Sequence, residues 1–342
     1  MTLRDRLSRI PEPELTGALD PIEPAIAASV DYLASDAALR SLEVDTYWPK
    51  WDSPWWHMVV LHELGLAHRI PARVVTRMVE GLDALPIHFF PLRLDELPPG
   101  TDPAVEISCH CALGCMYQVL TACGVDVARA LPWVEAWFPR YQMADGGLNC
   151  DSDAYLVDEC ASSMVGTVAP LEAMLLGRVE DWSPARRAFV DRAAGFLVAR
   201  ELRLGSPSAH NAEERTSAIG WLKPCFPRLY LYDVIRGLAA LVRWAEVTGG
   251  AFPETAVRVV VEHLATTFPD GVIRLQRRAY DGVGTRVKAP DGTWVRHPVA
   301  STFPLLDATS AIGRACPVTT AQWSRARRGL LALIDAGRVL PA

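Results

Sequence analysis

The sequence predicts an all-α protein in which a ring of buried helices lies inside a ring of covering helices, an α/α toroid. Two observations lead to this fold class. Nearly every long segment has the apolar period of a helix, and there is little of the alternating pattern that marks strands. The helices are also of two kinds, apolar nearly all round or amphipathic, and the two kinds alternate along the chain.

The predicted elements follow one another between proline and glycine breakers. A first helix is expected at 22–36. The helices that are apolar nearly all round, and therefore expected inside, are 54–67, 108–123, 160–176, 226–247 (apolar nearly all round over 226–243) and 299–312. The amphipathic helices, expected outside, are 71–85, 126–140, 184–202, 254–268 and 319–337. No linker is long enough to divide the chain, so we expect a single toroid domain over 1–342, with 1–20 as an N-terminal extension.

Composition excludes several classes of function. Half of the residues are hydrophobic, which is enough for a large core. The formal net charge is -6 and no lysine or arginine stripe is present, which argues against a nucleic-acid partner. No apolar run reaches the roughly 18 residues of a membrane span, and the N-terminus lacks the apolar core of a signal peptide. We therefore expect a cytoplasmic protein with reduced cysteines and a small-molecule substrate. The sequence carries no signal for an oligomeric state.

The stretch from Asp145 to Met174 is the most informative part of the chain. A polar turn, Asp145-Gly146-Gly147, leads into a segment rich in thiols and carboxylates, and a smooth apolar helix follows. Thiols and carboxylates just before a buried helix are typical of a metal site, because the helix dipole there lowers the cost of deprotonating a thiol. The alternative interpretation is a polar loop with two half-buried cysteines.

A toroid would bring residues from distant parts of the chain together. Its inner helices run parallel, so the residues that precede them gather at one mouth. This mouth is predicted to contain Trp55, Trp56, His57, Cys109, His110, Cys111, Cys150, Asp151, Asp158, Cys160, Cys225, Arg228, Tyr230, Tyr232, Asp233, Arg296 and His297. The result would be a thiol-rich, aromatic pocket. Its substrate-binding candidates are Trp56, His57, His110, Arg228 and Tyr230.

Several motifs resemble those of a known superfamily. DGGLNC at 145–150 resembles the QW-like turn of the prenyltransferase and squalene-cyclase superfamily, whose domains are α/α toroids. From about Cys109 to Asp307 the chain also resembles bacterial prenyltransferase-like proteins of unassigned reaction. The segments that carry this likeness are CALGC at 111–115, the cysteines at 150 and 160, and FPRLYLYDVIRGL at 226–238. The resemblance implies the toroid fold and leaves the reaction open.

A second likeness concerns a metal. LVDECASSM at 156–164 looks like the Val-Asp-x-Cys segment of protein prenyltransferase β subunits, where Asp and Cys bind catalytic zinc. It implies Asp158 and Cys160 as zinc ligands, with His297 as the third, although the spacing to His297 is longer than in that family. Cys111 or Cys150 would complete a cysteine-rich site instead. Three protein ligands leave an open catalytic position, whereas four make the site structural.

The function that follows is a zinc-dependent enzyme of transferase or cyclase type, acting on a small apolar or thiol-bearing metabolite. Asp151, Tyr232 and Asp233 are candidates for proton transfer or orientation. One alternative is a metal-free acid-catalysed cyclase or isomerase, because DSDA at 151–154 resembles an imperfect DxDD acid motif of class II terpene cyclases. The other is a non-catalytic toroid that binds a hydrophobic ligand.

Overall fold

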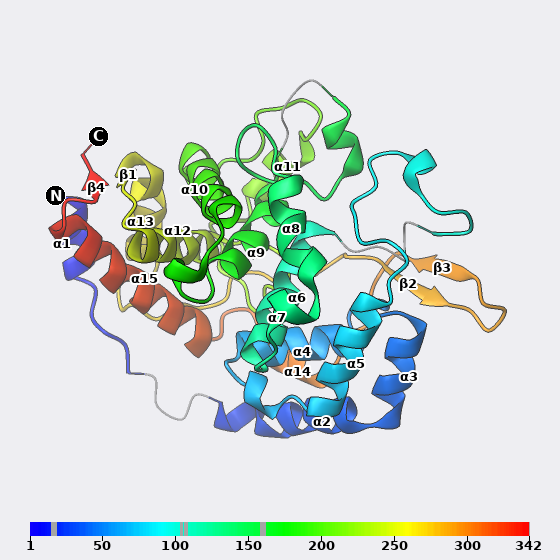
Figure 1. The fold of residues 1–342 in the computed structure, drawn as a ribbon. Coiled ribbons are helices and arrows are strands. Elements are labelled where there is room, and N and C mark those ends of the chain that lie inside the picture. Colours follow the sequence, from blue (N-terminus) through cyan, green and yellow to red (C-terminus); the bar gives the residue numbers. More distant parts are fainter. Residues whose placement is uncertain (15–18, 103–104, 106–108, 158–161, 342) are drawn as a thin grey trace.

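The computed structural model describes residues 1–14, 19–102, 105, 109–157 and 162–341 (Figure 1). These ranges are mostly helical, and their few strands are short, so the all-α prediction is confirmed. No helix within them combines the length and the apolar character needed to cross a bilayer.

The buried helices form a row in chain order. They are α4 (Pro54–Glu63), α6 (His110–Ala122), α9 (Met164–Met174) and α12 (Val234–Thr248), and each contacts the next. Nearly all residues of α4, α6 and α9 are buried, as expected of helices that are apolar on every side. The short α14 (Pro304–Thr309) lies against α4. These are the helices that the sequence predicted to lie inside.

Amphipathic helices cover this row. For example, α10 contacts α8 and α13 on the outside and also α9 and α12 on the inside. The covering helices are α2 (Glu23–Ala34), α3 (Asp36–Val44), α5 (Ala72–Asp83), α8 (Pro132–Arg140), α10 (Pro184–Ala199), α13 (Thr255–Thr267) and α15 (Pro317–Asp335). Shorter helices are α1 (Leu3–Ser8), α7 (Val127–Ala130) and α11 (Glu213–Ala218), with 3-10 turns η1 (Asp20–Ile22), η2 (Ala67–Arg69), η3 (Leu94–Glu96), η4 (Ser152–Tyr155) and η5 (Val179–Asp181).

The structure corrects the predicted helices at three places. The segment 226–233 is not helical, and α12 begins only at Val234, because Asp233 caps it. Pro132 divides the predicted helix 126–140 into α7 and α8. The predicted helix 299–312 shrinks to the six residues of α14.

Two small strand pairs were not predicted. Strands β2 (Thr285–Lys288) and β3 (Trp294–His297) form an antiparallel hairpin that projects beside α3 and α5 in Figure 1. Strand β1 (Phe252–Pro253) pairs in parallel with β4 (Val339–Leu340). Helix α1 packs on α13 and α15 and buries Leu3 and Leu7, so this part of the expected N-terminal extension belongs to the core.

Helices α6 and α9 approach each other at Gly114. A Cβ atom on Gly114 would lie 2.4 Å from the Pro170 nitrogen and 2.5 Å from the Ala169 carbonyl carbon, both of them backbone atoms of α9. Backbone atoms in a packed helix cannot move aside easily, so only glycine fits at this crossing.

We therefore expect Gly114→Ala to lower the free energy of unfolding by about 2–3 kcal/mol, through overpacking that moves α6 away from α9. Gly195→Ala in α10 is the matched control, because a Cβ atom on Gly195 would meet no described atom within 4 Å apart from the adjacent backbone of its own helix. This change should stabilise the protein by up to about 1 kcal/mol through helix propensity. Urea unfolding of both variants measures the difference, and equal stabilities would contradict the close approach.

Candidate metal centre and neighbouring cavities

Three cysteines meet at the start of α6. Cys109 is the residue before the helix, Cys111 lies in its first turn, and Cys150 follows the turn at 145–149. Their sulfur atoms all lie within 4.8 Å of one another, and the Cys109 and Cys111 sulfurs are 3.3 Å apart. Among the described residues, this is the group of three or more histidine, cysteine or acidic side chains that is close enough to share a metal ion.

The spacing of the sulfurs fits zinc. A tetrahedral zinc ion with ligands at about 2.3 Å places two sulfur atoms about 3.8 Å apart. This separation lies between the 3.3 Å from Cys109 to Cys111 and the 4.8 Å that bounds the whole group. Hydrogen bonds from the Cys111 and Cys150 thiols hold the pKa of Cys109 well below its usual range. The same contacts raise the pKa values of Cys111 and Cys150. The three sulfurs therefore hold one negative charge readily, and a dication would be needed to stabilise three thiolates together.

The turn at 145–149 is fixed by the beginning of α9. The Leu148 carbonyl accepts a hydrogen bond from the Ser163 amide, and Ser163 caps α9 through the Gly166 amide. The Thr167 hydroxyl accepts from the Leu148 amide. Since α9 also packs closely on α6, these contacts fix Cys150 next to Cys111, whose amide points at the Cys150 sulfur at 3.5 Å.

Aromatic side chains and one buried lysine surround the thiols. The Lys50 ammonium donates to the Tyr230 hydroxyl at 2.9 Å and lies 4.8–5.5 Å from the ring centres of Tyr47, Trp48, Trp51 and Tyr230. Burial lowers the pKa of Lys50, and the negative charge of the three cysteines opposes that shift. Lys50 is thus a cation held by ring faces next to a cluster of sulfurs.

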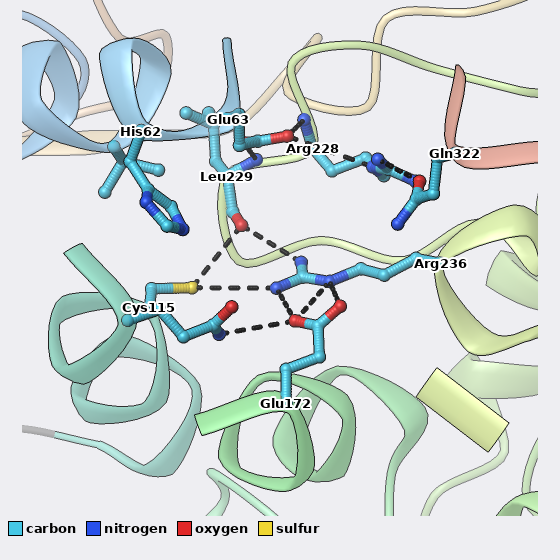
Figure 2. Close-up of a pocket in the computed structure, with 10 residues that line it drawn as sticks. His62, Glu63, Cys115, Glu172, Arg228, Leu229, Arg236 and Gln322 are labelled. Atoms are coloured by element: carbon cyan, nitrogen blue, oxygen red, sulfur yellow. Dashed lines mark hydrogen bonds and ion pairs between the residues drawn. The ribbon is translucent and has the colours of Figure 1, made fainter. Parts of the chain in front are cut away.

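A polar cavity of about 170 Å³ lies further along the same helices (Figure 2). It is lined mainly by polar and charged side chains from the last turns of α4 and α9, the middle of α6 and the starts of α12 and α15. These are His62, Glu63, Cys115, Gln118, Glu172, Arg228, Arg236 and Gln322. Cys115 follows Cys111 by one helical turn, so the cavity and the thiols lie on neighbouring levels of α6.

The charges of this cavity are paired with one another. Arg236 contacts the Glu172 carboxylate at 2.6–3.1 Å and donates to the Leu229 carbonyl (Figure 2). It also donates to the Leu231 carbonyl at 2.8 Å. Glu63 accepts from the amides of Arg228 and Leu229, at 2.9 and 2.6 Å. Burial raises the pKa of Glu63, and the two guanidinium groups lower it in part.

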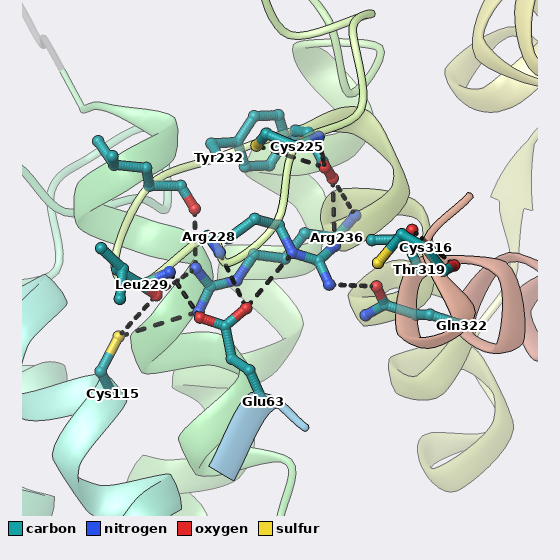
Figure 3. Close-up of polar contacts among 12 residues, drawn as sticks. Glu63, Cys115, Cys225, Arg228, Leu229, Tyr232, Arg236, Cys316, Thr319 and Gln322 are labelled. Carbon is teal, nitrogen blue, oxygen red and sulfur yellow. Dashed lines mark hydrogen bonds and ion pairs between the residues drawn. The ribbon is translucent and has the colours of Figure 1, made fainter. Parts of the chain in front are cut away.

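These contacts hold a turn at 228–231. Leu229 has a φ of 56°, in the left-handed region that costs a non-glycine residue about 1 kcal/mol or more. Glu63 binds the amide side of the turn and Arg236 its carbonyl side (Figure 3). The turn places Tyr230 against Lys50. The buried ion pairs thus position Tyr230 beside the thiol cluster.

The convergence that the sequence predicted is found for some residues. Cys111, Cys150, Trp56 and Tyr230 gather at one place, and the rings of Trp56 and Tyr230 are 5.9 Å apart. Cys109 belongs to the same group, although it was absent from the predicted ligand set. Its Cys-x-Cys spacing to Cys111 was the sequence feature that could have identified it as a ligand. Lys50 was also missed, and the only local signal was the surrounding WPKWDSPWW segment.

Two predicted zinc ligands, Asp158 and Cys160, lie outside the described residues. The third, His297, lies exposed on strand β3 and pairs with Thr285, outside the group of sulfurs. The expectation that His297 directly precedes an inner helix is wrong. The segment WVRH at 294–297 instead pairs with 285–288 as a strand, and α14 begins later, at Pro304.

The predicted catalytic residues make structural contacts. Tyr232 is buried and donates to the Leu202 carbonyl at 2.8 Å. Asp233 caps α12 through the Arg236 amide and pairs with Arg228 at 3.2 Å. Asp151 is 58% exposed and caps η4, and it lies 3.4 Å from His210. Asp153, the other carboxylate of the DSDA motif, is exposed as well.

Two predicted substrate-binding histidines are also held by neighbours. His110 accepts from the Trp137 indole at 2.7 Å through Nδ1, and its Nε2 lies 3.0 Å from the Tyr155 hydroxyl. Both ring nitrogens are therefore engaged, although His110 stands between two clustered cysteines. His57 stacks on Phe303 at 3.8 Å, and its Nδ1 lies 3.1 Å from the Ser29 hydroxyl.

Comparisons with known proteins give little further information. No protein-family model and no curated protein matches the chain. Solved structures of the type II terpene cyclase MstE from Scytonema align with it over nearly all of both chains. A variant bound to its substrate geranylgeranyl dihydroxybenzoate is 14% identical, covers 93% of this chain and 99% of that chain, and has a TM-score of 0.28. A second variant, without ligand, is 13% identical with a TM-score of 0.25. Likeness at this level defines neither fold nor function.

Proposed function

We propose that the chain is a zinc-dependent enzyme in which Cys109, Cys111 and Cys150 hold the metal at the start of α6. The buried helices would form the inner wall of an α/α toroid. The observation that carries the proposal is the meeting of three sulfurs within 4.8 Å from two segments 39 residues apart. A cluster of thiolate ligands selects zinc over magnesium or calcium. The free thiols of all described cysteines suit a reducing compartment such as the cytoplasm.

The reaction class that fits this site is a transferase or cyclase acting on a small metabolite. Zinc with an open coordination position supplies Lewis-acid chemistry or activates a bound thiol or water. The chain itself contributes the surroundings. Trp51 and Trp56 are buried and pack with Tyr230, and the Lys50 ammonium lies close enough to the cysteines to balance negative charge there.

Metal content of the purified protein tests the proposal. Protein prepared with zinc supplied and without chelator should contain one zinc ion per chain by elemental analysis. Each of Cys109→Ser, Cys111→Ser and Cys150→Ser should lose the ion. Cys123→Ser is the matched control, because this half-buried thiol donates to the Ala67 carbonyl and lies outside the cluster, so the variant should keep its zinc. Protein without stoichiometric metal would overturn the proposal.

The same measurement on Cys160→Ser assigns the fourth position. Cys160 is a ligand candidate from the sequence alone. If the variant keeps one zinc ion, three cysteines suffice and the open position favours catalysis. If it loses the ion, the site has four thiolate ligands and is structural, and the catalytic proposal fails while the metal site stands.

The alternative is a non-catalytic protein that binds a hydrophobic ligand. A cavity of about 250 Å³ favours it, because most of its lining is apolar, with Leu64, Phe226 and Leu275 among the contributors. This cavity contains Cys316 but none of the clustered cysteines. Absence of metal from the purified protein would favour this alternative.

A further inference from the structure

A third cavity is lined in part by Lys50. The hairpin β2–β3 folds against the segment 48–51, where the Lys50 amide donates to the Thr285 hydroxyl at 2.7 Å. The space between them is a cavity of about 380 Å³. Its charged lining residues are Lys50, Arg286 and Arg296, and Trp48 and Thr285 complete its polar and aromatic wall. Among the described residues no carboxylate lines it, although the chain as a whole carries a net charge of -6.

The two arginines stand directly opposite each other on the hairpin. The strand register pairs Arg286 with Arg296. Like charges at directly opposite positions destabilise a strand pair, so this arrangement is unfavourable unless an anion lies between them. Within the described ranges, neither guanidinium forms an ion pair with an acidic side chain. Arg286 is half-buried and Arg296 is exposed, so both can reach a ligand in the cavity.

Lys50 adds a third positive charge at the inner end of the cavity. An ammonium group has three N–H donors, and the hydrogen bond to the Tyr230 hydroxyl uses one of them. The four aromatic rings around Lys50 neutralise no charge. Lys50 also faces the three cysteines, and its two remaining N–H donors can serve an anion that enters from the hairpin side.

We propose that this cavity binds the phosphate or diphosphate group of a small-molecule substrate, with Arg286 and Arg296 as fork-shaped donors and Lys50 as the inner cation. Each arginine can bind two phosphate oxygens through two parallel hydrogen bonds. Three cations also match the negative charge of a diphosphate. The remainder of the ligand would lie toward Trp48, Trp51 and Tyr230, beside the thiols. The anion site itself does not depend on the presence of zinc.

Titration calorimetry with inorganic pyrophosphate and with inorganic phosphate tests this site. Wild-type protein should bind pyrophosphate at one site per chain, and Arg286→Gln and Arg296→Gln should each weaken binding by about tenfold. Lys288→Gln is the matched control. This variant removes one charge from the same strand, but Lys288 does not line the cavity. The variant should therefore bind pyrophosphate as tightly as the wild type. If phosphate binds as tightly as pyrophosphate, the ligand carries a single phosphate group. If phosphate binds more weakly, the ligand carries a diphosphate.

Two outcomes would overturn the inference. One is that pyrophosphate shows no saturable binding to the wild type. An equal loss of affinity in Lys288→Gln and Arg286→Gln counts the same way, because it would indicate only general attraction to a basic hairpin. The other comes from the Cys109→Ser variant. Unchanged pyrophosphate affinity in this variant supports the anion site even if the zinc proposal fails. Loss of binding there would mean that the anion is a ligand of the metal.

Discussion

Glu63→Ala should lower the free energy of unfolding by about 3–5 kcal/mol, the usual cost of removing one partner from a buried ion pair. The carboxylate is 15% exposed and lies 3.8 Å from the Arg228 guanidinium. Its oxygens also accept from two backbone amides, those of Arg228 and Leu229. Truncation leaves both amides without this acceptor. It also removes the hydrogen bonds that hold Leu229 in its left-handed conformation.

The matched control is Glu43→Ala. Glu43 is 59% exposed, and its ion pair with Arg77 has a length of 3.8 Å, so its removal should cost less than about 1 kcal/mol. Glu63→Gln should give an intermediate loss, because one amide oxygen still accepts while the other position becomes a donor. Guanidinium unfolding at fixed pH measures all three changes. If Glu63→Ala costs no more than Glu43→Ala, the buried pairs do not hold the turn.

The meeting of Cys111 with Cys150 could be predicted because it follows from helix periodicity. Apolar residues on every side mark α6 and α9 as inner helices, and consecutive inner helices are neighbours that point the same way. Residues just before such helices must then converge. Cys109 could have been added to the ligand set from its Cys-x-Cys spacing alone, since it is the residue before the same helix.

The position of Tyr230 could not be predicted from helix periodicity. The segment 226–233 contains enough apolar residues for a helix, yet Pro227 and the left-handed Leu229 belong to an irregular turn. What fixes this turn is Glu63, about 165 residues earlier, and Arg236 in the following helix. The local sequence cannot predict contacts between residues so far apart in the chain.

The surroundings of Lys50 depend on distant segments in the same way. Its amide binds Thr285, 235 residues later, and its ammonium binds Tyr230, 180 residues later. The hairpin at 285–297 escapes prediction because its strands have only four residues each, and two of the paired positions are arginines. Short strands with charged residues carry a weak alternating pattern.

The wild-type protein should lose stability as the pH falls below about 6.5, and His57 should account for a large share of the loss. His57 is 5% exposed, and burial lowers its pKa from 6.5 to about 3. The unfolded chain therefore binds a proton near pH 6.5, whereas the folded protein does not until about pH 3. Stability from neutral His57 is fully present above pH 6.5 and is lost as the pH falls toward 3, by about 5 kcal/mol in total.

Free energies of unfolding measured between pH 7 and pH 4 test this prediction with His57→Gln. Glutamine does not titrate, so the slope of stability against pH should become less steep, with a difference from wild type of about 3 kcal/mol by pH 4. The absolute stability of the variant does not enter the comparison.

Parallel curves for wild type and His57→Gln would contradict the assignment, because they would mean that His57 takes up its proton equally in the folded and unfolded states. That result would also affect the description of the inner helices. His57 lies between Tyr32 and Phe303, with ring centres 4.5 and 3.8 Å away. A charge on His57 would disfavour this packing, so parallel curves would indicate that one of the two rings moves away from the imidazole at low pH.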